Sequence, residues 1–379
     1  MPDILMGTGT AGLKGPGTPD ILIVLLPYTC NASLLTTDNY FRSGSVIYSK
    51  EAITKTGGKV RALFVNSGNA NCGLKESFEH ASLIAESIST ILNIKKEEVL
   101  VFSTGVIGKR LPINSVLKGI EEACSKFKAI SLEEASRVIG TTDRFEKIAT
   151  SKKGKLEVFG FAKGAGMIAP SMATMLSFVF TNVSLDPYDI HEMHKNINDI
   201  TFNSITVDGC QSTNDCSLLV SLDELVSDQE SIYENLLNVY KELAKKILED
   251  GEGSTKIVSI TVKGATLQMK AREIAKTIAN SLLVKTAIFG RDPNWGRIAA
   301  AAGSTEFPID QNTMKIYIGD YIIYDGAPNP EVENMVKNYL EKEKEVEIVV
   351  DLSEGESSWT YYTCDLGYEY IKLNAEYRT

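Results

Sequence analysis

Short apolar runs, each bounded by glycine, proline or polar residues, recur along the chain and predict β-strands. Each run is five to seven residues long, which suits a strand and is too short for a typical helix. The runs cover residues 21–26, 60–65, 99–103, 156–162, 175–181, 257–263, 314–318 and 346–352.

Other segments repeat apolar residues three or four positions apart and predict amphipathic helices. They cover residues 77–92, 115–127, 132–139, 229–248, 271–282 and 330–344. The predicted strands and helices mix without a strict alternation, which favours a layered α+β architecture over a Rossmann fold. Residues 223–231 read as an exposed connection.

One segment near the middle of the chain, residues 163–176, carries the most specific chemical signal. Its sequence is KGAGMIAPSMATML, in which Ala173 precedes Thr174. If the bond between them breaks, Thr174 gains a free α-amine beside its hydroxyl, and that amine can act as the base that activates the hydroxyl as a nucleophile. A buried strand preceded by a Gly-Pro turn explains the same pattern, and spacing alone leaves both interpretations open.

The same segment resembles the self-cleavage segment of the ornithine acetyltransferase (glutamate N-acetyltransferase) family. Seven further segments resemble family segments in family order: VNSGNANCG, FSTGVIGKR, TTD at 141–143, FNSITVDGCQSTND, DGEGSTK, GRDPNWGRIAAAAG and the terminal NAEYRT. Eight matches in order are far more specific than one.

The resemblance implies a fold in which helix layers flank stacked sheets, related to the self-cleaving aminopeptidases. It also implies autocleavage into an α chain, residues 1–173, and a β chain, residues 174–379. Because each piece holds only part of the core, we expect the pieces to stay associated, and the resemblance implies an α2β2 heterotetramer.

The implied reaction moves an acetyl group from N2-acetyl-L-ornithine to L-glutamate in arginine biosynthesis. Thr174 serves twice, first in cleavage and then as the carrier of the acetyl group, so ping-pong kinetics are expected. A bifunctional version also takes acetyl from acetyl-CoA, and the sequence does not separate the two. No cofactor and no metal are expected.

The resemblance assigns two further residues to catalysis. Thr104, through its hydroxyl, and Gly105, through its backbone N–H, would form an oxyanion hole for the tetrahedral intermediate. A strand-to-loop turn is the simpler structural explanation for this pair.

The remaining family positions contact substrate. They are Lys163, one of Thr141 and Thr142, Thr174, Glu252, Asn374 and Thr379. Without the resemblance, a solvated loop lysine is the favoured interpretation of Lys163. Glu252 sits where a helix C-cap turn is expected because Gly251 precedes it, and both roles are compatible. For the C-terminal residues, a disordered tail is the usual expectation. Asn294 and Trp295 are placed near the site without an assigned role.

Charge and hydropathy limit the kinds of binding partner that the protein is expected to have. The net charge is −10, and no Lys/Arg-rich run suggests nucleic-acid binding. The apolar run at 21–27 is too short to span a bilayer, and no signal peptide is recognisable, so we expect a cytoplasmic protein without membrane contact. The six cysteines include no CxxC pair, which favours reduced thiols over a zinc site.

The chain has three histidines, too few to favour a Ser-His or Cys-His hydrolase, whereas an N-terminal threonine needs none. His191 and His194 are three positions apart and are interpreted as an exposed helix face rather than a metal pair.

Two other functions remain open. One is a self-cleaving aminopeptidase or amidase of related fold, in which water replaces the amino-acid acceptor. The other is a non-catalytic amino-acid-binding protein in which Thr174 is part of the core.

Overall fold

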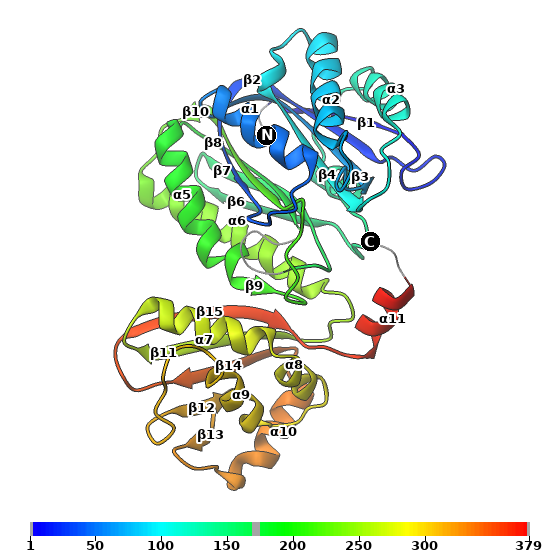
Figure 1. The fold of residues 1–379 in the computed structure, drawn as a ribbon. Coiled ribbons are helices and arrows are strands. Elements are labelled where there is room, and N and C mark those ends of the chain that lie inside the picture. Colours follow the sequence, from blue (N-terminus) through cyan, green and yellow to red (C-terminus); the bar gives the residue numbers. More distant parts are fainter. Residues whose placement is uncertain (1–2, 169–174, 377–379) are drawn as a thin grey trace. The chain divides into compact units, whose positions relative to one another are not determined.

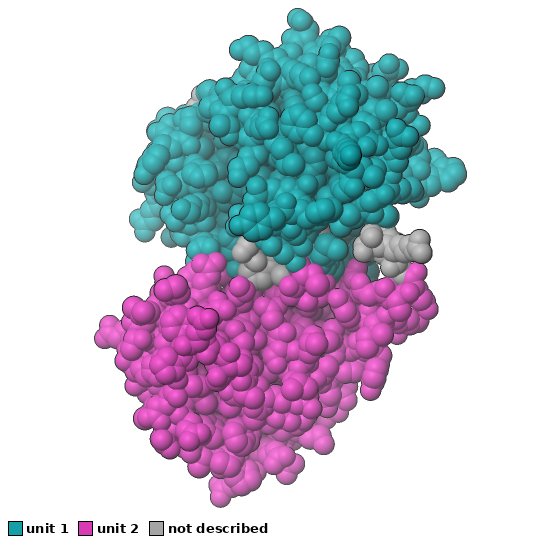
Figure 2. Space-filling view, in the orientation of Figure 1, with its two compact units in different colours: residues 1–203, 211–247, 379 teal, residues 204–210, 248–378 magenta. Residues whose placement is uncertain are grey.

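The computed structural model describes residues 3–168 and 175–376. They form two compact units (Figure 2), one comprising residues up to Asn203 together with Gln211–Ile247, the other Ser204–Cys210 together with residues from Leu248 onward. Each unit combines one mixed sheet with helices (Figure 1), so the α+β class expected from the sequence is confirmed.

In the described part of the first unit, nine strands form one sheet. They are β1 (Leu5–Gly9), β2 (Ile21–Thr36), β3 (Lys59–Asn69), β4 (Val99–Val106), β5 (Lys128–Ala129), β6 (Lys147–Lys153), β7 (Leu156–Lys163), β8 (Leu176–Val183) and β10 (Cys216–Leu225). The helices of this unit are α1 (Gly44–Lys55), α2 (Ser77–Leu92), α3 (Ile113–Cys124), α4 (Leu132–Ile139), α5 (Pro187–Ile200) and most of α6 (Gln229–Glu249), with short 3-10 turns at Lys96–Glu98 and Phe202–Ser204.

Alternation of side chains along the strands separates the two faces of this sheet. Phe178 of β8 and Leu218 of β10 belong to an apolar cluster shared with residues of α1, α2, α3 and α4. The intervening Ser217 instead meets His194 of α5. One face therefore carries the main core, and α5 covers part of the other.

Strands from both sides of residue 174 are interleaved in this sheet. Its order is β4-β3-β2-β10-β8-β7-β6, so β8 and β10, which follow residue 174, lie between β2 and β7, which precede it. β8 pairs antiparallel with β7, and β10 pairs antiparallel with β2. A break between residues 173 and 174 would therefore leave two pieces that share one ladder and one core.

In the second unit, the residues that the structure describes form a sheet of order β13-β12-β14-β11-β15-β9. Its strands are β9 (Ile205–Thr206), β11 (Ile257–Ala265), β12 (Lys315–Ile318), β13 (Tyr321–Asp325), β14 (Glu345–Asp351) and β15 (Ser357–Cys364). Its helices are α7 (Gln268–Asn280), α8 (Leu282–Phe289), α9 (Trp295–Ala302), α10 (Glu333–Lys342) and α11 (Tyr368–Glu376), with a 3-10 turn at Pro330–Val332. The buried side of α7, with Ile274 and Ile278, packs into the same apolar cluster as Ile260 of β11.

The eight predicted strands and six predicted helices all correspond to observed elements, but several elements were not predicted. Helix α1 buries Gly44, Ser45 and Ser49 beside Val46, Tyr48 and Ala52, so small and polar residues interrupt its apolar period. The exposed connection predicted at 223–231 is wrong at both ends, because β10 runs to Leu225 and α6 begins at Gln229. None of the helices in the described ranges combines the length and the apolar character that crossing a membrane requires.

The prediction of an exposed histidine pair is wrong for His194, although His191 is exposed. His194 is fully buried on α5, where Nδ1 lies 3.0 Å from Ser33 Oγ and Nε2 lies 2.8 Å from Ser217 Oγ. Burial, reinforced by the nearby His191, lowers the pKa of His194 to about 3.

Acid should therefore destabilise the fold through His194. The unfolded chain takes up a proton on this imidazole near pH 6.5, whereas the folded chain resists it, so stability is lost as pH falls from about 6.5 towards 3, by on the order of 5 kcal/mol. We expect urea-unfolding midpoints of a His194→Gln variant to fall less steeply than those of the parent protein over this range. His191→Gln serves as the control, and parallel slopes for His194→Gln and the parent would contradict the assignment.

Candidate active site

Three of the residues singled out from the sequence meet in the first unit. Lys163 ends β7 and is only 4% exposed. Its Nζ donates to Thr104 Oγ1 at 3.2 Å and to Thr141 Oγ1 at 2.9 Å. The interpretation of Lys163 as a solvated loop residue is therefore wrong, and a buried ammonium group links two hydroxyls.

The direction of these hydrogen bonds follows from the chemistry of the ammonium group. A protonated lysine has three donors and no acceptor, so both threonine oxygens must accept from Lys163. Each hydroxyl hydrogen is then left to point to another group. Such a hydroxyl, polarised by a buried cation, is suited to donate to a developing oxyanion.

Gly105 follows Thr104 at the end of β4, where the backbone requires glycine. Its φ is +127°, and a Cβ at this position would come within 2.4 Å of the Gly68 carbonyl carbon. The register between β3 and β4 is irregular at the same point, at Gly68 and Asn69. The Thr104–Gly105 backbone is thus held in a conformation that a regular strand does not adopt.

Asp143, in the loop after α4, is hydrogen-bonded to the backbone on both sides of the Lys163–Thr141 contact. Its carboxylate accepts from Thr141 N at 2.9 Å, from Gly164 N at 2.8 Å and from Lys147 Nζ at 2.6 Å. Burial by itself would raise the pKa of Asp143, but the ammonium groups of Lys163 and Lys147 hold it at about 2. This role of Asp143 was not predicted from the TTD segment, although the segment contains the carboxylate.

A second buried aspartate, Asp215, has its pKa shifted in the opposite direction. Asp215 is 1% exposed, and its Oδ1 accepts from Met175 N at 2.9 Å. Burial raises its pKa well above the ordinary 3.8, and the Met175 N–H, the Lys163 charge and hydrogen bonds from Ser212 offset this only in part. The TND string gave no signal for this role, because its Gly and Asn neighbours indicated only turns.

In the second unit, Glu252 and Asn374 are in direct contact. Asn374, on α11, donates through Nδ2 to Glu252 Oε2 at 2.8 Å. The turn that carries Glu252 closes α6, since Gly251 N donates to Leu248 O at 3.1 Å. Gly253, with φ +72°, lies so close to α11 that a Cβ there would be 2.5 Å from Tyr370 N. The described part of the C-terminal segment is therefore a docked helix rather than a disordered tail.

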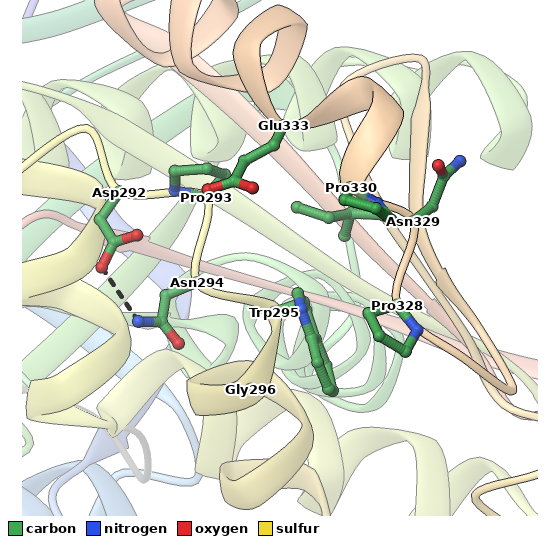
Figure 3. A pocket seen from close by; sticks show the side chains of 10 residues that line it. Asp292, Pro293, Asn294, Trp295, Gly296, Pro328, Asn329, Pro330 and Glu333 are labelled. Carbon is green, nitrogen blue, oxygen red and sulfur yellow. Dashed lines mark hydrogen bonds between the residues drawn. The ribbon is translucent and has the colours of Figure 1, made fainter.

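Trp295 and Asn294 line a separate cavity of about 370 Å³ in the second unit (Figure 3). Trp295 stacks on Tyr324 at a centroid distance of 4.8 Å, and Asn294 Nδ2 donates to Asp292 Oδ2 at 2.9 Å. Neither Glu252 nor Asn374 is among the described residues that line this cavity.

Thr142 is half-buried next to Thr141. Ala173, Thr174 and Thr379 lie outside the described residues, so their roles stay predictions. Within the described ranges, no group of three His, Cys, Asp or Glu side chains is placed to hold a metal ion. The groups that the described site offers are thus hydroxyls, ammonium groups and carboxylates.

Comparison with known proteins now bears on this arrangement. The model of the ArgJ family matches residues 5–379. The chain is 58% identical over 380 residues to "Arginine biosynthesis bifunctional protein ArgJ" of Aquifex aeolicus, with 100% of both sequences covered. It is 39% identical over 381 residues to "Glutamate N-acetyltransferase" of Methanopyrus kandleri, with 97% of both covered.

A solved structure also resembles this chain. The crystal structure of arginine biosynthesis bifunctional protein argJ from Bacillus halodurans aligns with a TM-score of 0.52 and 37% identity, covering 54% of this chain and 100% of that one. The family resemblance drawn from the sequence is confirmed: the chain belongs to the ArgJ family and is an acyltransferase of arginine biosynthesis.

Proposed function

We propose that the chain cleaves itself between Ala173 and Thr174 and then transfers acetyl from N2-acetyl-L-ornithine to L-glutamate through Thr174. The observation that carries the proposal within the site is the buried Lys163 ammonium group bonded to the Thr104 and Thr141 hydroxyls. The names of the two relatives, a bifunctional arginine-biosynthesis protein and a glutamate N-acetyltransferase, support the same reaction.

In the cleavage step, the Thr174 hydroxyl oxygen attacks the Ala173 carbonyl carbon, and the peptide C–N bond breaks as an ester forms. Water then hydrolyses the ester, which leaves a carboxylate on Ala173 and a free α-amine and hydroxyl on Thr174. The interleaved positions of β8 and β10 in the sheet support continued association of the two pieces. An α2β2 assembly is part of the proposal.

In the transfer steps, the Thr174 amine takes the hydroxyl proton while the oxygen attacks the acetyl carbonyl of acetylornithine. The acetyl C–N bond breaks, and the ornithine amine leaves with that proton. The amine of glutamate then attacks the acetyl ester, the C–O bond breaks, and the Thr174 oxygen is reprotonated. Thr104 and Gly105 would stabilise the oxyanion in both transfers, where one such donor contributes about 3–4 kcal/mol.

We assign Thr141 rather than Thr142 to the substrate contact, because the Thr141 hydroxyl is bonded to Lys163. Glu252 would bind the cationic side-chain amine of ornithine by a charge-assisted hydrogen bond. Asn374 supports this role because its amide donates to Glu252 and orients the carboxylate. Thr379 is proposed as a further substrate contact.

The reaction is tested with purified protein, acetylornithine and glutamate. We expect ornithine and N-acetylglutamate to form in equal amounts, with parallel double-reciprocal lines because the acetyl-enzyme forms before glutamate binds. The control omits glutamate and should give no more than one ornithine per active site. Continued ornithine release without glutamate would instead favour the hydrolase.

Acetyl-CoA is proposed as a second donor. Replacing acetylornithine by acetyl-CoA in the same assay separates a bifunctional enzyme from a monofunctional one, since only the former produces N-acetylglutamate from glutamate and acetyl-CoA. The same measurement on a Thr174→Ala variant gives the background.

A further inference from the structure

Two segments that have no role in the proposed reaction, VNSGNANCG and FNSITVDGCQSTND, meet at the side chain of Asn214. Asn214 is 6% exposed in the first unit, shortly before β10. Its Nδ2 donates to Ala70 O at 2.7 Å and to Ser103 O at 2.8 Å. Ala70 follows the end of β3, and Ser103 lies on β4 directly before Thr104. One amide group therefore joins β4 to the segment that follows β3.

The orientation of this amide follows from its partners. A backbone carbonyl only accepts hydrogen bonds, so the NH₂ group of Asn214 must face Ala70 and Ser103. The amide oxygen, Oδ1, accepts from Thr213 Oγ1 at 2.5 Å. Both hydrogens and the oxygen of the amide are thus in use, and the side chain is committed to this backbone contact.

Backbone hydrogen bonds on either side hold Asn214 itself in place. Ser43 N donates to Thr213 O at 3.0 Å, and Thr37 N donates to Asp215 O at 3.0 Å. Because the backbone on both sides is anchored, the Asn214 amide can restrain the carbonyls that it contacts rather than follow them.

The restrained backbone is the irregular one that carries Thr104 and Gly105. Asn69 of β3 is paired with both Thr104 and Val106, so the regular ladder is interrupted at this point. An interrupted ladder restrains a peptide less, and another group has to hold it. The carbonyl of Ser103 and the N–H of Thr104 belong to one planar peptide unit, so a hydrogen bond to Ser103 O fixes the plane that leads into Thr104.

Asn66 holds the side chain of the same serine. Ser103 Oγ donates to Asn66 Oδ1 at 2.6 Å, and Asn66 Nδ2 donates to Asn69 O at 2.8 Å. Asn66 thus binds the Ser103 hydroxyl and the irregular end of β3, whereas Asn214 binds the Ser103 carbonyl. The two asparagines act on different groups of one residue, and only Asn214 contacts the peptide unit that continues into Thr104.

We propose that Asn214 is a positioning residue for the oxyanion hole, whose amide holds the β3–β4 backbone in the conformation that presents the Thr104 hydroxyl and the Gly105 N–H to the oxyanion. This inference rests on the proposed function. Donors of this kind are effective only when they are held in place before the charge develops, so a small displacement is costly. Ala70 and Ser103 precede residue 174 and Asn214 follows it, so after cleavage one piece would hold the oxyanion hole of the other.

The test compares Asn214→Ala with the parent and with Asn235→Ala. Asn235 is a matched control because it is also a buried asparagine of the first unit, 4% exposed. Its Nδ2 donates to Ser231 O at 2.8 Å, and its Oδ1 accepts from Ser151 Oγ at 2.6 Å. For each protein we would measure the cleaved fraction by intact mass, the unfolding midpoint, and kcat and KM for acetyl transfer per cleaved chain.

We expect kcat of Asn214→Ala to fall about 10- to 100-fold, because displaced donors stabilise the oxyanion less. The KM for acetylornithine should stay within about threefold, because both transfers use the same hole and no proposed substrate contact is removed. Asn235→Ala should lower the unfolding midpoint and leave kcat within twofold of the parent. A kcat of Asn214→Ala within twofold of the parent would overturn the proposal.

A double-mutant cycle with Thr104→Ala separates positioning from a general loss of stability. If Asn214 acts through the oxyanion hole, removal of the Thr104 hydroxyl leaves it less to position. The double variant should then be at least about fivefold faster than the product of the two single effects predicts. Single effects that multiply within twofold would show that Asn214 does not act through Thr104, and the proposal would fail.

If Asn214→Ala does not fold, Asn214→Asp decides by the same criteria. Aspartate keeps the shape and the acceptor for the Thr213 hydroxyl but offers at most one donor. Failure of both variants to fold, beside a folded Asn235→Ala, would reduce Asn214 to a structural anchor and overturn the proposal. Folded variants that stay uncleaved would place its role in cleavage and also overturn it. Absence of cleavage or of acetyl transfer in the parent protein is a different result, because it removes the proposed function itself.

Discussion

Replacing Thr174 with alanine is expected to leave the 379-residue chain in one piece and to abolish acetyl transfer. The variant lacks the hydroxyl that attacks the Ala173 carbonyl, so neither the ester nor the free α-amine can form. The parent protein should give two pieces, one of which starts at Thr174. Intact mass and N-terminal sequencing of both proteins provide the measurement, followed by the acetylornithine–glutamate assay.

Thr174→Ser is the matched control for this experiment. Serine keeps the hydroxyl and should still cleave and transfer, at a reduced rate. A parent protein that remains a single chain under native conditions would remove the α-amine base, and the binding-protein interpretation would then be the better one. Cleavage of Thr174→Ala at the same bond would show that another group performs it.

The second large effect is expected from Lys163→Met. Methionine preserves much of the side-chain volume but removes the ammonium group that donates to Thr104 and Thr141. The Thr104 hydroxyl then loses the contact that directs its hydrogen, and we expect kcat to fall about 10²- to 10³-fold, the usual effect of losing one oxyanion-hole donor. Steady-state kinetics on the cleaved protein measures this fall.

Stability has to be separated from catalysis in that variant, because Lys163 also helps to keep Asp143 charged. Lys270→Met is a suitable control. Lys270 is 5% exposed in the second unit and donates to Pro308 O at 2.6 Å, so its loss should lower the unfolding midpoint with little change in kcat. If Lys163→Met kept kcat within twofold of the parent, Lys163 would have only a structural role.

The difference between Asp143 and Asp215 illustrates what local sequence does not encode. Both are aspartates that follow small polar residues, in TTD and in TND. One faces two ammonium groups and has a pKa of about 2, whereas burial outweighs the hydrogen bonds and the Lys163 charge at the other and raises its pKa. The charge state of a buried carboxyl depends on neighbouring groups that are distant in the sequence, so a short segment around the aspartate does not contain them.

Helix α1 and strand β10 were missed for a related reason. Apolar periodicity predicts an element only when the element buries apolar side chains on one side. Helix α1 buries Val46, Tyr48 and Ala52 in the apolar cluster, but glycine and serine share that face, with Ser49 Oγ donating to Val101 O at 2.7 Å, so its apolar periodicity is weak. β10 lies in the middle of a sheet, where both faces are covered, so its sequence lacks a clear alternation of apolar and polar residues.

By itself the sequence determined the α+β class, the positions of the strongly periodic elements, the family, and the residue types available for chemistry. Those properties are local, since they follow from spacing, turn residues and short motifs. Only the tertiary structure decided that Lys163 meets Thr104 and Thr141, which are 59 and 22 positions away from it. It also decided that β8 and β10 insert between β2 and β7, and that Asp215 holds the amide next to Thr174. Burial and long-range packing set these contacts, because the free energy of a buried polar group depends on the partners that the whole fold brings to it.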